Sequence, residues 1–104
     1  MDTNDDVISR IEQEWSSSDG FFYYLRQGLF DPPSYDRLMR LLASFSELDE
    51  DAVLPRRLIS LLWYIPSFMM WQRERVAEAG GDVSSLDKAA TLIHNELERI
   101  LGVP

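Results

Sequence analysis

The residues of this chain that could do chemistry are carboxylates. Asp and Glu supply 18 of its 104 residues, against one histidine and no cysteine. Two carboxylates suffice for glycoside hydrolysis, but only where a fixed cleft raises the pKa of one of them. Nucleophilic triads and most metal sites need sets of histidines or cysteines that this sequence does not hold. We therefore expect binding through the carboxylates, with no catalytic residue.

Neither of the two carboxylate patterns that resemble ligand sites predicts a metal ion or a cofactor. The densest run, Glu47-Leu48-Asp49-Glu50-Asp51, lacks the alternating ligands, central glycine and terminal glutamate of an EF-hand loop. His94 lies one helical turn before Glu98, a spacing that predicts a surface or boundary ion pair. We expect the chain to bind no metal and no cofactor.

All of the net negative charge lies in the first half of the chain. Residues 1–51 carry twelve acids against four arginines, whereas residues 52–104 carry six acids against six bases, so the first half holds the whole formal charge of −8. Such an asymmetry governs partners and association rates more than fold. Because a phosphate binder needs a net basic face, we expect no binding to nucleic acid.

Composition predicts a single globular domain over residues 1–104. The chain is 45% hydrophobic and holds twelve aromatic residues, enough to bury a core. The lack of cysteine and of a signal-peptide pattern at the N-terminus leads us to expect a cytoplasmic protein. The longest charge-free stretch, residues 58–71, is too short to span a bilayer. We expect it to form a central core helix and leave open that it offers one face to a partner.

The elements that must position these side chains are all expected to be helices. No region alternates with period two for long enough to form a strand, whereas apolar residues recur at helical spacing. We expect an all-α, single-domain bundle of five to six helices, the higher number applying if Pro66 splits the fourth one. Ser18 or Asp19, Ser34, and Ser84 with Asp87 are expected to cap the second, third and last helices. The helices are expected over about residues 4–16, 20–28, 34–45, 55–79 and 84–101.

Acids and surplus aromatic residues of the first half form the candidate binding site. Four aromatic residues in a row, 21–24, cannot all face one core, so we expect about two of them to remain partly exposed. Interface hot spots favour tyrosine, and acids around such anchors steer a basic partner. The predicted partner-binding residues are Asp19, Tyr23, Tyr24, Asp31, Tyr35, Asp36, Glu47, Asp49, Glu50 and Asp51.

The tyrosine pair Tyr23-Tyr24, together with the acids of that set, resembles the small acidic helical immunity proteins of bacteria. Those proteins neutralise nuclease colicins and the toxins of contact-dependent growth inhibition. Inhibitors of nuclease colicins carry a proline directly after their tyrosine pair, where this chain has Leu25. The resemblance implies an inhibitor that is monomeric when free and that occludes the basic C-terminal nuclease domain of a cognate toxin.

Two other classes of function stay open at this stage. A helical adaptor or regulatory subunit of a stable complex would expose part of the apolar 58–71 region and associate through it. An enzyme with an unrecognised carboxylate pair would lose turnover after a single acid-to-amide change.

Overall fold

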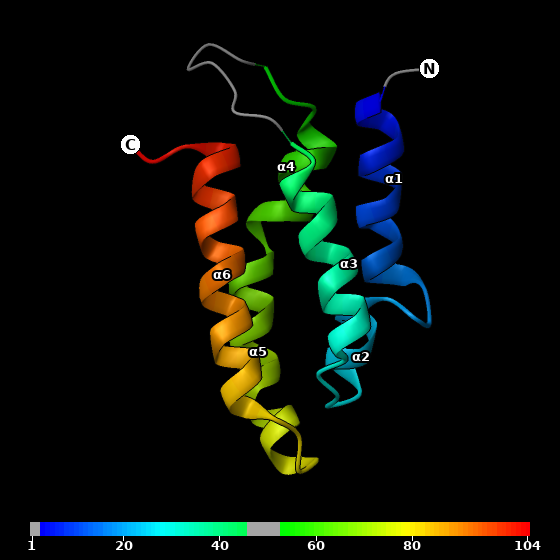
Figure 1. Cartoon of the computed structure of the whole chain (residues 1–104), viewed down its shortest axis with the longest axis vertical. Helices are drawn as coiled ribbons and strands as arrows, with labels where there is room; N and C mark the ends of the chain where they lie inside the picture. The colour runs from blue at the N-terminus through cyan, green and yellow to red at the C-terminus, as the bar shows by residue number, and fades with distance from the viewer. Residues whose placement is uncertain (1–2, 46–52) are drawn as a thin grey trace.

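Every regular element of the chain is an α-helix in the computed structural model, which describes residues 3–45 and 53–104. Because no strand occurs in these two ranges, the predicted all-α class is confirmed. In chain order the helices are α1 (Thr3–Ser16), α2 (Phe21–Arg26), α3 (Pro32–Ala43), α4 (Arg56–Trp63), α5 (Ile65–Glu78) and α6 (Val83–Leu101) (Figure 1).

Four of the helices in the described ranges, α1, α3, α5 and α6, build the bundle, with lengths from 12 to 19 residues. α3 packs against both α1 and α6, and α6 packs against α5, as Figure 1 shows. The short α2 contacts α1 and α5 and so closes the ring. The predicted count of five to six bundle helices is therefore wrong, since α2 and α4 are segments of six and eight residues that cover the long helices.

Aromatic side chains from α1, α2 and α5 meet in the core. Trp15 stacks on Phe22 with ring centroids 4.0 Å apart and meets Phe68 edge-on at 4.9 Å. Phe21 and Phe22 are fully buried, whereas the two tyrosines that follow them are half-buried. This confirms the prediction that about two of the four consecutive aromatic residues pack inward.

The charge-free stretch is split into two helices, as its proline predicts. α4 ends at Trp63 and α5 begins at Ile65, one residue before Pro66. Proline has no N–H to donate, and its ring clashes with the preceding turn, so a continuous helix is disfavoured here. The indole N–H of Trp15 donates to the carbonyl of Leu61 at 3.2 Å and satisfies one acceptor near the end of α4. α1 therefore stabilises the break.

Acidic side chains cap α3 and α6. A carboxylate oxygen of Asp31 accepts the backbone N–H of Ser34 at 3.0 Å, and one of Asp82 accepts that of Ser85 at 2.9 Å. The prediction that Ser34 and Ser84 are the caps is wrong, because both helices begin before these serines. An acid at this position also interacts favourably with the positive end of the helix dipole.

Low pH is expected to weaken the hydrogen bonds by which Asp82 caps α6. Hydrogen bonds from Ser85 hold the pKa of Asp82 below its ordinary value of 3.8. The stabilisation is therefore complete above that value and is lost as the pH falls through the lower pKa of the folded state. Asp82→Asn keeps a capping side chain without the titration. Its urea midpoint should fall less than that of the wild type between about pH 6 and about pH 2, and equal falls would contradict this role.

Candidate functional site

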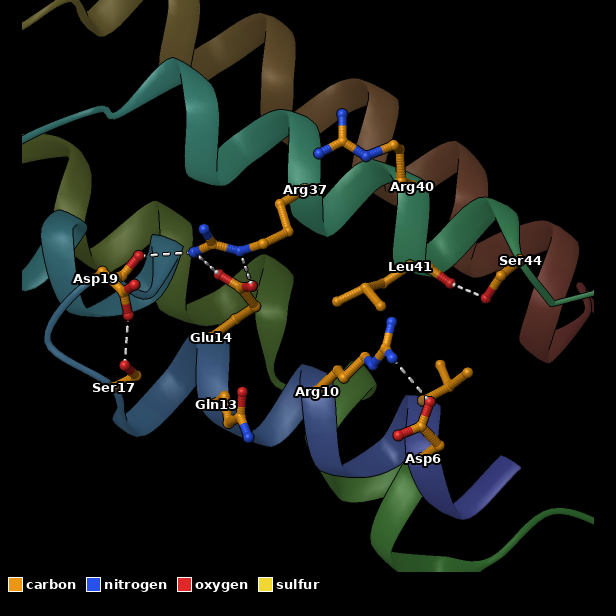
Figure 2. A pocket seen from close by; sticks show the side chains of 11 residues that line it. Asp6, Arg10, Gln13, Glu14, Ser17, Asp19, Arg37, Arg40, Leu41 and Ser44 are labelled. Carbon is orange, nitrogen blue, oxygen red and sulfur yellow. Dashed lines mark hydrogen bonds and ion pairs between the residues drawn. The ribbon is translucent and has the colours of Figure 1, made fainter. Parts of the chain in front are cut away.

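A groove with a volume of about 660 Å³ runs between α1 and α3 (Figure 2). Acidic and basic side chains line it in equal number, three of each sign, so the groove has no formal net charge. In charge it differs from the acidic surface expected from the sequence, with which it shares Asp19. The charged residues that line it are Asp6, Arg10, Glu14, Asp19, Arg37 and Arg40.

A buried ion pair closes one end of this groove. The Glu14 side chain is only 4% exposed, and its two oxygens accept from Nε and Nη2 of Arg37 at 2.6 and 2.9 Å. This bidentate geometry is the strong form of an arginine–carboxylate contact. Hydrogen bonding to Glu14 raises the pKa of Arg37.

The same pair holds the α1–α2 junction against α3. Oε1 of Glu14 also accepts the backbone N–H of Phe21 at 3.0 Å, and Nη2 of Arg37 donates to the carbonyl of Asp19 at 2.7 Å. Figure 2 shows Glu14 and Asp19 converging on the guanidinium. α2 has no cap from its own N-cap residue, Gly20, so the prediction of a cap from Ser18 or Asp19 is wrong. Because both Glu14 oxygens already accept hydrogen bonds, we interpret this cluster as a structural contact that stabilises the packing of α1, α2 and α3.

Six of the predicted partner-binding residues lie around α2 and the start of α3. Three of them also have internal roles. The Asp19 carboxylate accepts from Ser17, and Asp31 caps α3. The Tyr35 ring packs against Phe21, with centroids 5.7 Å apart, and its desolvation raises the pKa of its hydroxyl. Available to a partner are the exposed Asp36 and the half-buried faces of Tyr23, Tyr24 and Tyr35.

The other four predicted residues, Glu47, Asp49, Glu50 and Asp51, lie outside the described residues. The described chain stops at Phe45, just beyond the C-terminal end of α3. Asp31 precedes this helix as its N-cap, and Asp36 lies in its second turn.

The charge-free stretch exposes aromatic residues on α4 and α5, which is the alternative that the sequence left open. Leu58, Leu62, Ile65 and Met69 face the core, with spacings of four, three and four residues. Phe68 is also buried, whereas Ile59 and Trp63 are exposed, so the stretch 58–71 supplies core residues and also presents an outer face. The sequence did not show which of its large residues lie on that outer face. The α4–α5 surface, as we name it, consists of Ile59, Trp63, Tyr64, Met70 and Trp71.

The remaining candidate chemistry is limited in the part of the chain that the structure describes. Nε2 of His94 lies 2.8 Å from a carboxylate oxygen of Glu98, which confirms the predicted pairing. No group of three or more histidines or acids is placed to hold a metal ion in residues 3–45 and 53–104. Nor is any helix of these ranges both long and apolar enough to cross a membrane.

Comparisons with known proteins place the chain in no family. No protein-family model matches it, and neither the curated proteins nor the solved structures compared with it contain a match. Its function must therefore be inferred from its own surface chemistry.

Proposed function

We propose that this chain is an immunity protein that binds and neutralises a cognate bacterial toxin. Its target would be a basic nuclease domain, and it would inhibit by covering the active or substrate-binding site. The observation that carries this proposal lies where α2 contacts α3: Asp36 is exposed beside the half-buried Tyr35 on α3, and Tyr23 and Tyr24 are half-buried on α2. We name these four residues the corner surface.

The corner surface combines the two properties that an inhibitor of a basic protein needs. Tyrosine rings supply apolar contact area with few rotatable bonds, and such residues dominate binding energy at interfaces. The Asp36 carboxylate makes no ion pair with any described residue, so it is available to an arginine or lysine of a partner. A nuclease must be basic where it holds phosphate, so acids compete directly for that surface.

The charge of the first half supports the same proposal. Residues 3–45 hold seven acids and four arginines, and the segment 46–52 adds four acids. An acidic surface attracts a basic partner over distance and accelerates association, an effect that salt suppresses. Inhibition by occlusion requires no chemistry from the inhibitor.

Neutralising the acids is expected to slow association with the toxin domain. At low salt, Asp36→Asn should lower the on-rate by about threefold, and the triple change of Asp49→Asn, Glu50→Gln and Asp51→Asn by about tenfold. Both variants should show a weaker salt dependence, because fewer charges take part in steering. The measurement is stopped-flow association at two salt concentrations.

The binding partner for this experiment would be the basic C-terminal domain of any large secreted protein encoded beside this chain. Glu98→Gln is the matched control, since it removes one exposed acid from the half of the chain that is formally neutral. Co-expression should also restore the growth of cells that make the toxic domain. If no neighbouring basic domain binds the chain, the proposal is overturned.

A second candidate function is a helical adaptor or regulatory subunit of a stable complex. The exposed α4–α5 surface favours it, because a permanent partner would cover apolar residues of this kind. Purification from the native cells separates the two functions. An adaptor would be recovered in a stoichiometric complex under all growth conditions, whereas an immunity protein would be recovered without a different partner protein when no toxin is present.

A further inference from the structure

The α4–α5 surface is continuous and unusually aromatic. Trp63 is 58% exposed, Met70 66% and Trp71 59%. The ring of Tyr64 lies between the two tryptophans, with centroid separations of 5.6 Å to Trp63 and 5.7 Å to Trp71. Ile59, one turn before Trp63, extends the surface along α4 at 39% exposure. Large apolar side chains exposed together mark an interaction site more often than isolated ones do.

The two ends of this surface carry opposite charges. Arg56 lies one turn before Ile59, and Glu74 lies one turn after both Met70 and Trp71. Glu78 follows one turn later. All three side chains are exposed, and none forms an ion pair with another described residue. The surface therefore runs from a basic end through an aromatic centre to an acidic end.

Two of the three neighbouring arginines are paired with acids of other helices. Arg57 pairs with Glu12 on α1. Arg73 pairs with Asp87 on α6, with a bond of 3.0 Å. Arg75 keeps its charge but donates to the carbonyl of Arg26 at 2.8 Å, which turns it toward α2, and Glu74 and Glu78 still outnumber it at this end.

We propose that the α4–α5 surface is the interface of a homodimer in which two copies pair antiparallel about a twofold axis. In such an interface the same surface of each copy meets the other, so it must be complementary to itself. Arg56 and Glu74 lie nine residues before and after Ile65, the first residue of α5. Antiparallel pairing sets the basic end of each copy against the acidic end of the other, with the aromatic centres in contact.

The available area agrees with a dimer. A fully buried aromatic side chain covers about 150–250 Å², so at their exposures the two tryptophans alone offer about 250 Å². The isoleucine, the tyrosine and the methionine raise the apolar area to roughly 400 Å² per copy. At the apolar share of about 65% that is typical of homodimers, this area corresponds to an interface of roughly 600 Å² per partner, which is at the lower end of the range for stable interfaces. Polar side chains around the aromatic centre would supply the other third.

The charge pattern favours a second copy over other occupants. A uniformly basic protein would be attracted to the acidic end of the surface and repelled by Arg56. An anionic lipid surface would be repelled by Glu74 and Glu78. The corner surface shares no residue with the α4–α5 surface, so dimerisation does not depend on the proposed inhibitory function. The proposed dimer differs from the free monomer that the resemblance implied.

The first test is sedimentation of the whole chain over a wide range of concentration. The wild type should sediment as a reversible dimer, and Trp63→Gln and Trp71→Gln should each weaken the dimer by about 30-fold. The control is Leu92→Gln, which changes an exposed leucine of α6 outside this surface and should alter the dissociation constant by less than about twofold. A wild type that stays monomeric at every concentration overturns the proposal, as does a dimer unaffected by both tryptophan changes.

The second test uses charge reversal and distinguishes antiparallel pairing from any other contact. Arg56→Glu alone and Glu74→Arg alone should each weaken self-association by about tenfold, because like charges then meet at both ends. An equimolar mixture of the two variants should dimerise again, since each new charge meets its opposite. Circular dichroism of each variant is the control for folding. If the mixture remains as weak as its components, the antiparallel arrangement is wrong.

Discussion

Replacement of Glu14 with glutamine is expected to lower the free energy of unfolding by about 2–3 kcal/mol. Glutamine has nearly the same shape but presents an amide N–H₂ where Arg37 needs an acceptor. The change also leaves a guanidinium without its counter-charge at the α1–α3 contact. Removing one partner of a buried ion pair costs about 3–5 kcal/mol. The Arg37 side chain is 40% exposed and becomes hydrated when the pair is broken, so we expect the lower range of about 2–3 kcal/mol.

Glu12 offers a matched control on the same helix. It pairs with Arg57, but both side chains are about half exposed, so Glu12→Gln should cost much less than Glu14→Gln. Urea unfolding of the two variants measures the difference directly. Double-mutant cycles that combine each glutamate change with Arg37→Gln should give a coupling energy for Glu14 and Arg37 well above that for Glu12 and Arg37. Equal losses for the two glutamates would mean that the Glu14–Arg37 pair does not hold the helices together.

The helices of this fold could be predicted because their signals are local. Apolar residues at spacings of three and four define the buried faces of α1, α3 and α6, and Pro66 marks the break between α4 and α5. The caps of α3 and α6 were misplaced because each helix start offers two kinds of capping residue, an aspartate just before the helix and a serine in its first turn. The sequence does not show which of them reaches a backbone N–H.

The tertiary features of the site could not be predicted in the same way. Glu12 and Glu14 are two residues apart on one amphipathic helix, and only the return of α2 and α3 over α1 buries one of them. Trp63 and Trp71 are hydrophobic and lie in a charge-free stretch, so composition alone favoured the core. Their exposure follows from which face of α4 and α5 the smaller apolar residues occupy, a property of packing between helices.

Substitution of Gly20 with alanine is expected to be as destabilising as the loss of Glu14, at about 3 kcal/mol. Gly20 has φ −78° and ψ 150°, a conformation that any residue adopts, so backbone strain does not explain the glycine. The reason is space. A Cβ atom here would lie 2.7 Å from the carbonyl oxygen of Gln13 and even closer to that of Glu14. These are backbone atoms of α1, which cannot move aside as a flexible side chain does.

Relief of this clash requires the start of α2 to move away from α1. That movement would also lengthen the bond between the N–H of Phe21 and the Glu14 carboxylate, so Gly20 and Glu14 are expected to be coupled. Gly80→Ala is the control. Gly80 has a positive φ of 75°, but a Cβ atom at this position would meet nothing within 4 Å, so only conformational strain of about 1 kcal/mol applies. Thermal or urea unfolding should therefore rank Gly20→Ala well below Gly80→Ala in stability. The opposite order would show that α2 can move away from α1 without loss of stability. It would also show that the hydrogen bonds of Glu14 do not depend on the close approach of these two helices.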